Sequence, residues 1–491
     1  MELHGVRTLE DDSAPKQITT VNMSVIGLVG TAPLAEAGTA ASLTTGSSIL
    51  NNQVIYTAAE PGEEGNQLQV RAVAGEADSS GGAETYATFA EELLTITLGT
   101  DTDGTIIATA ADVVAAVSEL GPEAISAALP DGLAGEGVIV PFGKTSLAGG
   151  GDEPFPLYTP ALIAGSRTQA KKLSVLGSLS HDMYDILNQT GAYVIVVRVP
   201  EVPGEDLQRA AIIRGIEALQ LGQSSVNYTP RILIAPDWST DDGVGKALES
   251  MAERCRAIAY LDSPSMATPE EVSRRGQMYG ARVELLRPRI KVVSDIAGRT
   301  LNRPYSAAAA GHRVRIDSTK GFWWSKSNQE VLGFTGLEQV DSYMVGDDTC
   351  VANQLNQANV STIVQMDGYK HWGNRLCTND PQYRFEAVRR TVDVIEDSIQ
   401  LMVTKEYLDA PVSKSLGVSM LGSVNSYLRQ QITAGVIISG TAWLDEELNT
   451  PETLAAGVVY INIALTTKSP AEQIIIKYSL NKNTGQVSLA A

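Results

Sequence analysis

The chain has 491 residues, 43% of them hydrophobic and 19% charged, a length that suits about two to four globular domains. Its net charge of −20 argues against a nucleic-acid partner, because phosphate contacts need clustered Lys and Arg. No apolar run approaches the roughly 18 residues of a membrane span, and residues 1–12 do not resemble a signal peptide. We therefore expect assembly in a cytoplasm, with no direct membrane insertion.

Residues 1–20 are too polar to form a core element, so they are predicted to be an extended N-terminal arm. Val6, Leu9 and Ile18 are spaced for strand pairing with another subunit. Residues 21–49 begin the first folded domain with a buried strand, which ends at turn residues.

Residues 50–153 are predicted to be an inserted, acidic, β-rich domain. They hold 17 Asp or Glu and only two basic residues, a net charge of −15. Strand-like runs at 53–58, 68–73, 93–98 and 137–142 surround one helix that starts near Thr109. A Gly run followed by two prolines then marks the end of the module.

Residues 154–350 alternate between apolar strands and amphipathic helices, which indicates an α/β domain together with residues 21–49. The expected strands of its sheet are 158–165, 192–199, 231–236, 257–262 and 289–294.

Residues 351–471 are predicted to form a C-terminal core domain. Its long helix has an apolar face, made by Phe385, Val388, Val392, Ile395, Ile399 and Met402. A second helix spans about 416–434, and strand-like stretches follow it. Residues 472–491 are expected to be a C-terminal strand and arm, with pairing positions at Ile474, Ile476, Tyr478, Val487 and Leu489. The fold class is thus α/β and α+β multidomain, with a mixed-sheet core, two arms and an insert.

The sequence offers little for catalysis, so we expect neither an enzyme nor a bound cofactor or metal. The loop 137–145 has the wrong spacing for a P-loop, and no helix pattern follows it. There is no GxSxG, CxxC or HExxH motif, and the three cysteines do not form a disulfide framework.

Three stretches resemble the contractile bacteriophage tail sheath family, which includes the sheaths of R-type pyocins. They are GFWWSKSNQEVLGFTGLE (321–338), DGYKHWGNRLC (367–377) and WLDEELNTPETLAAGVVYINI (443–463). The opening residues 4–33 also resemble the start of that family.

The resemblance implies a structural virion protein that polymerises as stacked hexameric rings around a tail tube. Contraction would drive the tube through the host envelope during genome delivery. The implied partners are further copies of the chain, the tail tube protein, and the baseplate and tail terminator or neck proteins. The arms would reach into neighbouring subunits, the insert would face outward, and the C-terminal domain would lie near the tube.

Two further sets of residues are candidates for contacts between proteins. Arg384, Arg389 and Arg390 could face an acidic tube surface, and intramolecular ion pairs are the alternative. Cys350 and Cys377 could cross-link neighbouring subunits after the particle leaves the reducing cytoplasm, although an isolated Cys is more often a small buried hydrophobe.

Other functions remain open at this level. A sheath from a pyocin-like or secretion apparatus would have the same sequence features. An α/β enzyme that uses the middle sheet, and a capsid or surface-layer protein, are the remaining alternatives.

Overall fold

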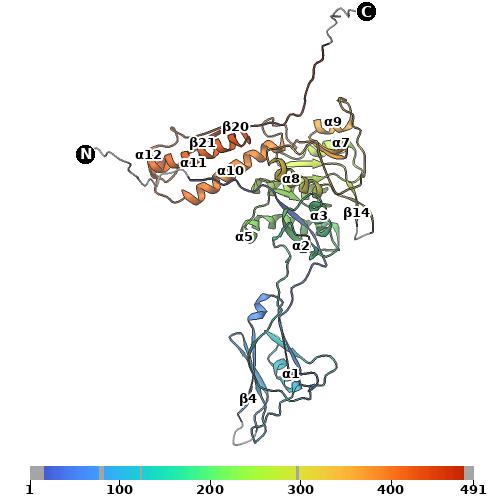
Figure 1. Cartoon of the computed structure of the whole chain (residues 1–491), viewed down its shortest axis with the longest axis vertical. Helices are drawn as coiled ribbons and strands as arrows, with labels where there is room; N and C mark the ends of the chain where they lie inside the picture. The colour runs from blue at the N-terminus through green and yellow to red at the C-terminus, as the bar shows by residue number, and fades with distance from the viewer. Residues whose placement is uncertain (1–15, 77–81, 122–123, 295–297, 480–491) are drawn as a thin grey trace, which may run out of the picture. The chain divides into compact units, whose positions relative to one another are not determined.

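The computed structural model describes residues 16–76, 82–121, 124–294 and 298–479 (Figure 1). The chain divides into two compact units. The first comprises Met1–Val29, Asp182–Ile195 and Ile212–Ala491, and the second comprises Gly30–His181 and Val196–Ala211.

The largest sheet has nine strands and is mixed. In sheet order they are β16 (Gln329–Glu330), β19 (Tyr369–Trp372), β18 (Val360–Gln365), β13 (Val283–Leu286), β12 (Ile258–Asp262), β11 (Ile232–Ile234), β1 (Val25–Thr31), β10 (Tyr193–Val199) and β9 (Ala161–Ala164). The run from β1 through β11, β12 and β13 to β18 is parallel, and β19 pairs antiparallel with β18 and β16. Every residue of β1, β11, β12 and β13 is buried, which explains their continuous apolar sequences and confirms the α/β fold class.

Helices connect and flank these strands. They are α3 (Leu179–Leu187), α4 (Glu205–Ala218), η2 (Leu219–Leu221), α5 (Gly222–Val226), α6 (Asp242–Cys255), α7 (Pro269–Gly276), α8 (Ser306–Lys320) and α9 (Val351–Gln357). α7 shows why they begin where they do: Thr268 and Glu271 form a capping box, and Pro269 occupies the first helical turn, where its missing N–H costs nothing.

One predicted strand belongs to a different sheet. Residues 289–294 were expected in the α/β sheet, but β14 (Ile290–Ser294) pairs antiparallel with β15 (Arg299–Arg303) and β17 (Gly336–Leu337). β13, just before it, takes the place in the large sheet, because its residues are all buried whereas those of β14 alternate.

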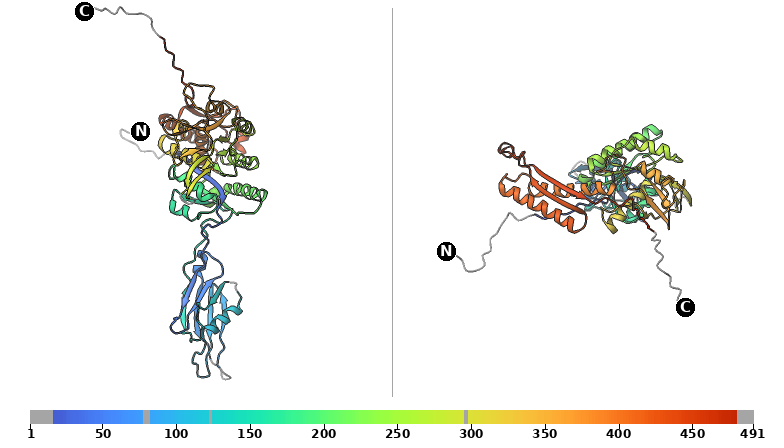
Figure 2. Two further views of the ribbon diagram at one scale, coloured as in Figure 1. Left: turned by 90° about the vertical axis from the view of Figure 1, so that its right-hand side faces the viewer. Right: turned by 90° about the horizontal axis from the view of Figure 1, so that it is seen from above.

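The C-terminal part of the first unit is a helical layer with a hairpin. α10 (Glu386–Glu406) and α11 (Lys414–Thr433) lie side by side in Figures 1 and 2, next to β20 (Ile437–Leu444) and β21 (Ile461–Thr467). A short helix, α12 (Pro451–Ala455), lies in the loop between the two strands. Residues 468–479 carry neither helix nor strand.

The second unit contains two small sheets with their own core. One has the order β2 (Ser42–Thr45), β3 (Val54–Ala58), β7 (Ile125–Ala128), and the other β5 (Tyr86–Ala90), β6 (Leu93–Leu98), β4 (Gln69–Ala74), β8 (Phe142–Ser146). This unit also contains η1 (Glu63–Gln67), α1 (Ala110–Glu119) and α2 (Arg167–Lys171). A buried cluster between Ala41 and Leu147 holds the two sheets and α1 together.

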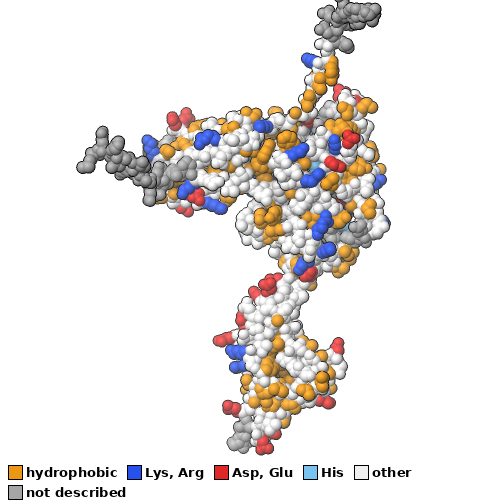
Figure 3. Space-filling view, viewed as in Figure 1, with side chains coloured by type: hydrophobic (Ala, Val, Ile, Leu, Met, Phe, Trp, Pro, Cys, Tyr) orange, Lys and Arg blue, Asp and Glu red, His pale blue; other side chains and the backbone are white. Residues whose placement is uncertain are grey.

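The sequence located four of these elements of the second unit. β3, β4, β6 and α1 confirm the predicted positions, whereas the strand expected at 137–142 forms only at β8. Figure 3 shows acidic side chains spread over this unit, with hydrophobic side chains gathered between them. No helix within the described ranges is both long and apolar enough to cross a membrane.

Candidate assembly surfaces

The helical layer is held by one apolar cluster that α10, α11 and the hairpin share. Ile395, Ile399 and Met402 of the predicted apolar face of α10 are buried in it, against Val424 and Leu428 of α11. Ser413 caps α11, because its hydroxyl accepts a hydrogen bond from the N–H of Leu416.

The first described residues of the chain run along this layer. The Lys16 N–H donates to the Ser423 hydroxyl at 2.6 Å, and the Val21 N–H donates to the Ser398 hydroxyl at 3.0 Å. Ile18 is buried in the apolar cluster between the two helices. The prediction that Ile18 pairs with a neighbouring subunit is therefore corrected, because its side chain belongs to the core of its own chain.

Val6 and Leu9 lie outside the described residues, as do Val487 and Leu489 at the other end. The C-terminal segment that is described leaves the fold at Glu472, whose carboxylate accepts two hydrogen bonds from Arg375, each 2.7 Å long.

Beyond Glu472 the apolar side chains are exposed, whereas Ile18 near the start of the chain is buried. Ile474, Ile476 and Tyr478 are 78%, 67% and 90% exposed and belong to no strand. Large apolar side chains this exposed are typical of a segment that awaits a partner.

The three candidate tube-facing arginines have different surroundings. Arg384 is partly exposed and lies 3.9 Å from Glu472. Arg389 is mostly buried and pairs with Asp393 at 2.8 Å. Arg390 is completely buried and pairs with Asp317 at 2.6 Å. Arg390 therefore forms the intramolecular ion pair, and its side chain is not available to a tube.

The two candidate cross-linking cysteines are buried. Cys350 and Cys377 are each 6% exposed, and burial raises the pKa of the Cys377 thiol to about 12. The fold therefore favours the small buried hydrophobe for both residues over an inter-subunit disulfide.

Sequence reasoning missed a buried charged cluster beneath the helical layer. Lys326, from the GFWWSKSNQ segment, is completely buried, with its Nζ 2.5 Å from Glu284 of β13 and 3.2 Å from Glu386 of α10. The same ammonium lies over the ring of Tyr260, 3.8 Å from its centre. The Tyr260 hydroxyl donates a hydrogen bond to Glu386.

The charges in this cluster compensate for one another. Burial would raise the pKa of Glu386, but the charges of Lys326 and Arg313 outweigh that effect and hold it well below its usual range. The pKa of Glu284 is also lowered, against burial and chiefly by Lys326. One signal in the sequence could have revealed the cluster, namely a glutamate in the otherwise apolar strand VELL.

The carboxyl ends of the parallel strands, where an α/β enzyme would bind its ligand, are occupied by structural hydrogen bonds. The Asp262 carboxylate accepts from the N–H groups of Tyr305 and Ser306, each at 2.8 Å, at the start of α8. Arg275 donates to the carbonyl oxygens of Asp262 and Ser239. Among the described residues, no group of His, Cys, Asp or Glu is arranged to hold a metal ion.

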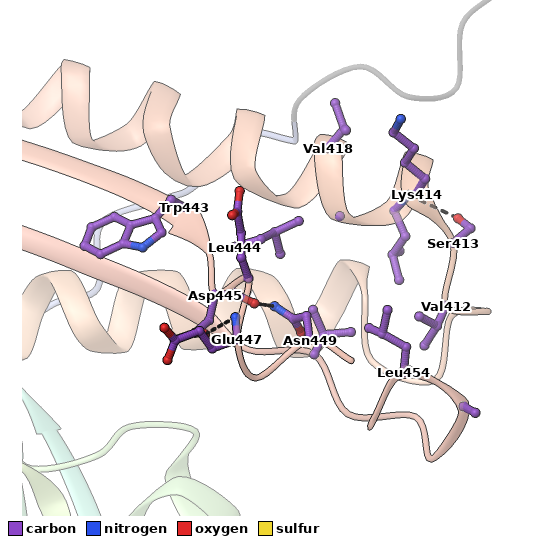
Figure 4. Close-up of a pocket in the computed structure, with 15 residues that line it drawn as sticks. Val412, Ser413, Lys414, Val418, Trp443, Leu444, Asp445, Glu447, Asn449 and Leu454 are labelled. Atoms are coloured by element: carbon purple, nitrogen blue, oxygen red, sulfur yellow. Dashed lines mark hydrogen bonds between the residues drawn. The ribbon is translucent and has the colours of Figure 1, made fainter. Parts of the chain in front are cut away.

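A groove opens at the far end of the helical layer. Its volume is about 1240 Å³, and it lies where the start of α11, the end of β20 and α12 meet (Figure 4). Val418 of α11 and Trp443 of β20 are both exposed on its walls.

Comparison with known proteins places two family domains side by side along the chain. The family model for the phage tail sheath protein central domain matches residues 210–375, and that for the phage tail sheath C-terminal domain matches residues 378–481.

Individual relatives agree. A putative prophage major tail sheath protein of Pseudomonas aeruginosa (strain UCBPP-PA14) is 32% identical over 64% of this chain and 83% of its own length. The tail sheath protein of Burkholderia phage BcepMu is 29% identical over 96% of this chain and 95% of its own.

Solved structures share the fold. The contracted sheath complex of the extracellular contractile injection system PVC covers 67% of this chain and 89% of its own, with a TM-score of 0.52 at 16% identity. The baseplate of the anti-feeding prophage in its contracted state covers 67% of this chain and 91% of its own, with a TM-score of 0.55 at 20% identity.

Proposed function

The chain belongs to the phage tail sheath family and is a structural subunit of a contractile sheath; we propose that it polymerises as stacked hexameric rings around a tail tube and contracts to drive that tube through the host envelope. The family assignment confirms the resemblance seen in the sequence. The observation that carries the proposal is that the two sheath domain models match successive segments of residues 210–481. In addition, the tail sheath protein of phage BcepMu matches this chain over nearly its full length.

The test is electron microscopy of the purified full-length protein. Hollow cylinders of uniform diameter are expected, and co-expression with the tube protein should give cylinders with a filled axis. Closed shells, flat sheets or particles that never exceed a monomer would contradict the proposal. The quoted curated relatives are named as phage or prophage proteins, which favours a phage tail over a pyocin-like or secretion apparatus.

Three folded modules have separate roles in this proposal. Residues 21–49 and 154–350 form the α/β body together with β18 and β19, the helical layer and hairpin of residues 351–471 form the core domain near the tube, and residues 50–153, which β2 joins, face outward. The self-contained apolar cluster and the charge of −15 support an outward insert, because like charges on neighbouring inserts repel and keep particles apart.

The arms link neighbouring subunits by strand addition. Among the described residues, β20 and β21 pair only with each other, and Asn425 of α11 bonds both main-chain groups of Ala442 in β20, so the edge left without a main-chain partner is that of β21. An extended segment from a neighbour can pair with such an edge through main-chain hydrogen bonds. Because Ile18 stays in its own core, residues 1–15 and 472–491 remain as the exchanging arms.

The partners in this proposal are further copies of the chain, the tube, the baseplate and the neck or terminator proteins. Arg384 and Arg389 remain candidates for the tube contact, since 37% and 15% of their side-chain surface is exposed. The protein works without catalysis, cofactor or nucleic acid, is assembled in the host cytoplasm, and ends as the sheath of the virion tail.

A further inference from the structure

The groove at the end of the helical layer has the character of a docking site. Eight of its lining residues are apolar: Val412, Leu416, Val418, Trp443, Leu444, Leu454, Ala455 and Val459. Figure 4 shows Lys414 on one side of it and Asp445 with Glu447 on another. A concave apolar surface with charges at its rim is typical of a site that binds a peptide segment.

The N-terminal residues of the same chain run toward this groove. The Thr20 hydroxyl lies 3.4 Å from that of Tyr427, and four residues earlier Lys16 reaches Ser423 of the same helix. From Thr20 back to Lys16, the chain thus runs along α11 in the direction of the first residue of that helix. From Ser423 to Gly417 at the groove is about 9 Å of helix, a distance that about three extended residues span.

Residues 1–15 therefore have ample length to reach the groove and cross it. Fully extended, they span up to ~50 Å. Their path begins at Lys16, whose ammonium also lies 3.8 Å from Glu406 near the end of α10.

The chemistry of residues 1–15 matches the groove in order. The acidic run 10–12 comes first along the path, and it meets Lys414 at the start of α11, a helix terminus that has no acidic residue of its own. Leu3, Val6 and Leu9 follow at every third position and supply three apolar side chains for the apolar lining of the groove.

Arg7 lies between these apolar residues. On this path it comes to the part of the rim that carries Glu446 and Glu447, both of which are exposed.

We propose that, before assembly, residues 3–12 occupy the groove of their own chain. The N-terminal arm then stays bound in cis until it pairs with a neighbouring subunit. This inference rests on the proposed exchange of arms and adds a competing site for one of them. Docking in cis slows polymerisation, because the arm must leave its own groove before it can pair elsewhere.

The first test traps the contact by disulfide formation in the full-length protein with Val6→Cys and Val418→Cys. The matched control pairs Val6→Cys with Met344→Cys, since Val418 and Met344 are 59% and 67% exposed. The native thiols are buried and give little background. We expect an intramolecular bond that forms at least about tenfold faster than in the control, because a tethered segment has a millimolar effective concentration.

The rate of the trapped bond should not depend on protein concentration. Equal rates in the two variants would overturn the proposal. A disulfide-linked dimer as the main product would also overturn it, because the occupant would then be a second copy. Trapping is measured on the unassembled subunit, so its outcome is independent of whether cylinders form.

The second test measures the consequence for assembly. Val418→Asp places a charge in the groove and should shorten the lag before cylinders appear by about tenfold, if the groove holds most of the unassembled arms. Met344→Asp is the control and should leave the lag unchanged. An unchanged or longer lag for folded Val418→Asp protein would overturn the inhibitory role, whereas loss of cylinders in the unsubstituted protein would count against the proposed function instead.

Discussion

Substitution of Lys326 by Met tests whether the buried charged cluster holds the subunit together. Methionine keeps the length of the side chain and removes the ammonium that lies between Glu284 and Glu386. Glu386 keeps Arg313 nearby, with its Nη1 3.7 Å away. Within the described part of the chain, Glu284 keeps the Ser361 hydroxyl, at 2.7 Å, and His371.

The size of the effect follows from the proton that Glu284 must then take up. To hold a carboxyl neutral at pH 7 when its pKa in the unfolded chain is about 4.3 costs about 3.7 kcal/mol, at about 1.4 kcal/mol per pH unit. That value lies within the roughly 3–5 kcal/mol lost when one partner of a buried ion pair is removed.

The pH dependence has a definite sign. In the variant the pKa of Glu284 is raised above its unfolded value, so stability is lost as pH rises through the window above about 4.3. The cost should fall to about 1 kcal/mol at pH 5. In the unsubstituted chain the pKa values of Glu284 and Glu386 are lowered, so the stability they contribute is present above their unfolded pKa and is lost only in acid.

Urea unfolding followed by circular dichroism at pH 5 and pH 7 measures both quantities. Lys320→Met removes an exposed lysine of α8 and should change the free energy of unfolding by less than about 0.5 kcal/mol. Lys326→Met combined with Glu284→Gln removes the stranded carboxylate and should restore most of the loss. A loss below about 1 kcal/mol at pH 7 would refute the reasoning, since His371, whose pKa is lowered by burial, would then have taken up a proton and supplied the charge.

The remaining predictions concern assembly. Removal of residues 1–15 or 473–491 should leave a folded monomer that forms no cylinders, and normal cylinders from both truncated proteins would refute arm exchange. Deletion of 52–152 should still give cylinders, so loss of all assembly by a folded protein would make the insert structural. Arg384→Glu should weaken binding to the tube and spare self-assembly, and unchanged tube binding at raised salt would remove that contact. Non-reducing gels of intact particles should show only monomers, because Cys377 and the other thiols are buried.

The strands of the large sheet were predictable because each is a continuous apolar run. That pattern identifies a strand that is covered on both faces, and β1, β10 and β12 were found in this way. The same pattern does not say which sheet a strand joins. Residues 289–294 were predicted as such a run although Lys291 interrupts it, and their pairing, in a local hairpin with β15 and with the more distant β17, separates them from the main sheet.

The surface contacts were harder to predict because burial of a charge depends on a distant partner. Arg389 and Arg390 are adjacent in an amphipathic helix, a pattern that predicts solvent-exposed side chains. Asp317, which receives Arg390 inside the fold, precedes it by 73 residues. Ile18 was misplaced for a related reason: a polar arm with a few apolar residues looks the same whether it packs on its own chain or on a neighbour.

The buried cluster ties together the two segments that the sheath domain models match separately. Glu284 and Lys326 lie in the central segment, whereas Glu386 and Arg390 lie in the C-terminal one, and the Arg390 guanidinium also donates to the carbonyl of Met23 just before β1. A hinge between the segments would separate these charges without water to replace their partners, at a cost of several kcal/mol. We therefore expect α10, and the groove and hairpin packed with it, to move with the sheet as one body. We then expect changes of the sheath lattice to fall to the terminal arms, whose described apolar residues beyond Glu472 are exposed.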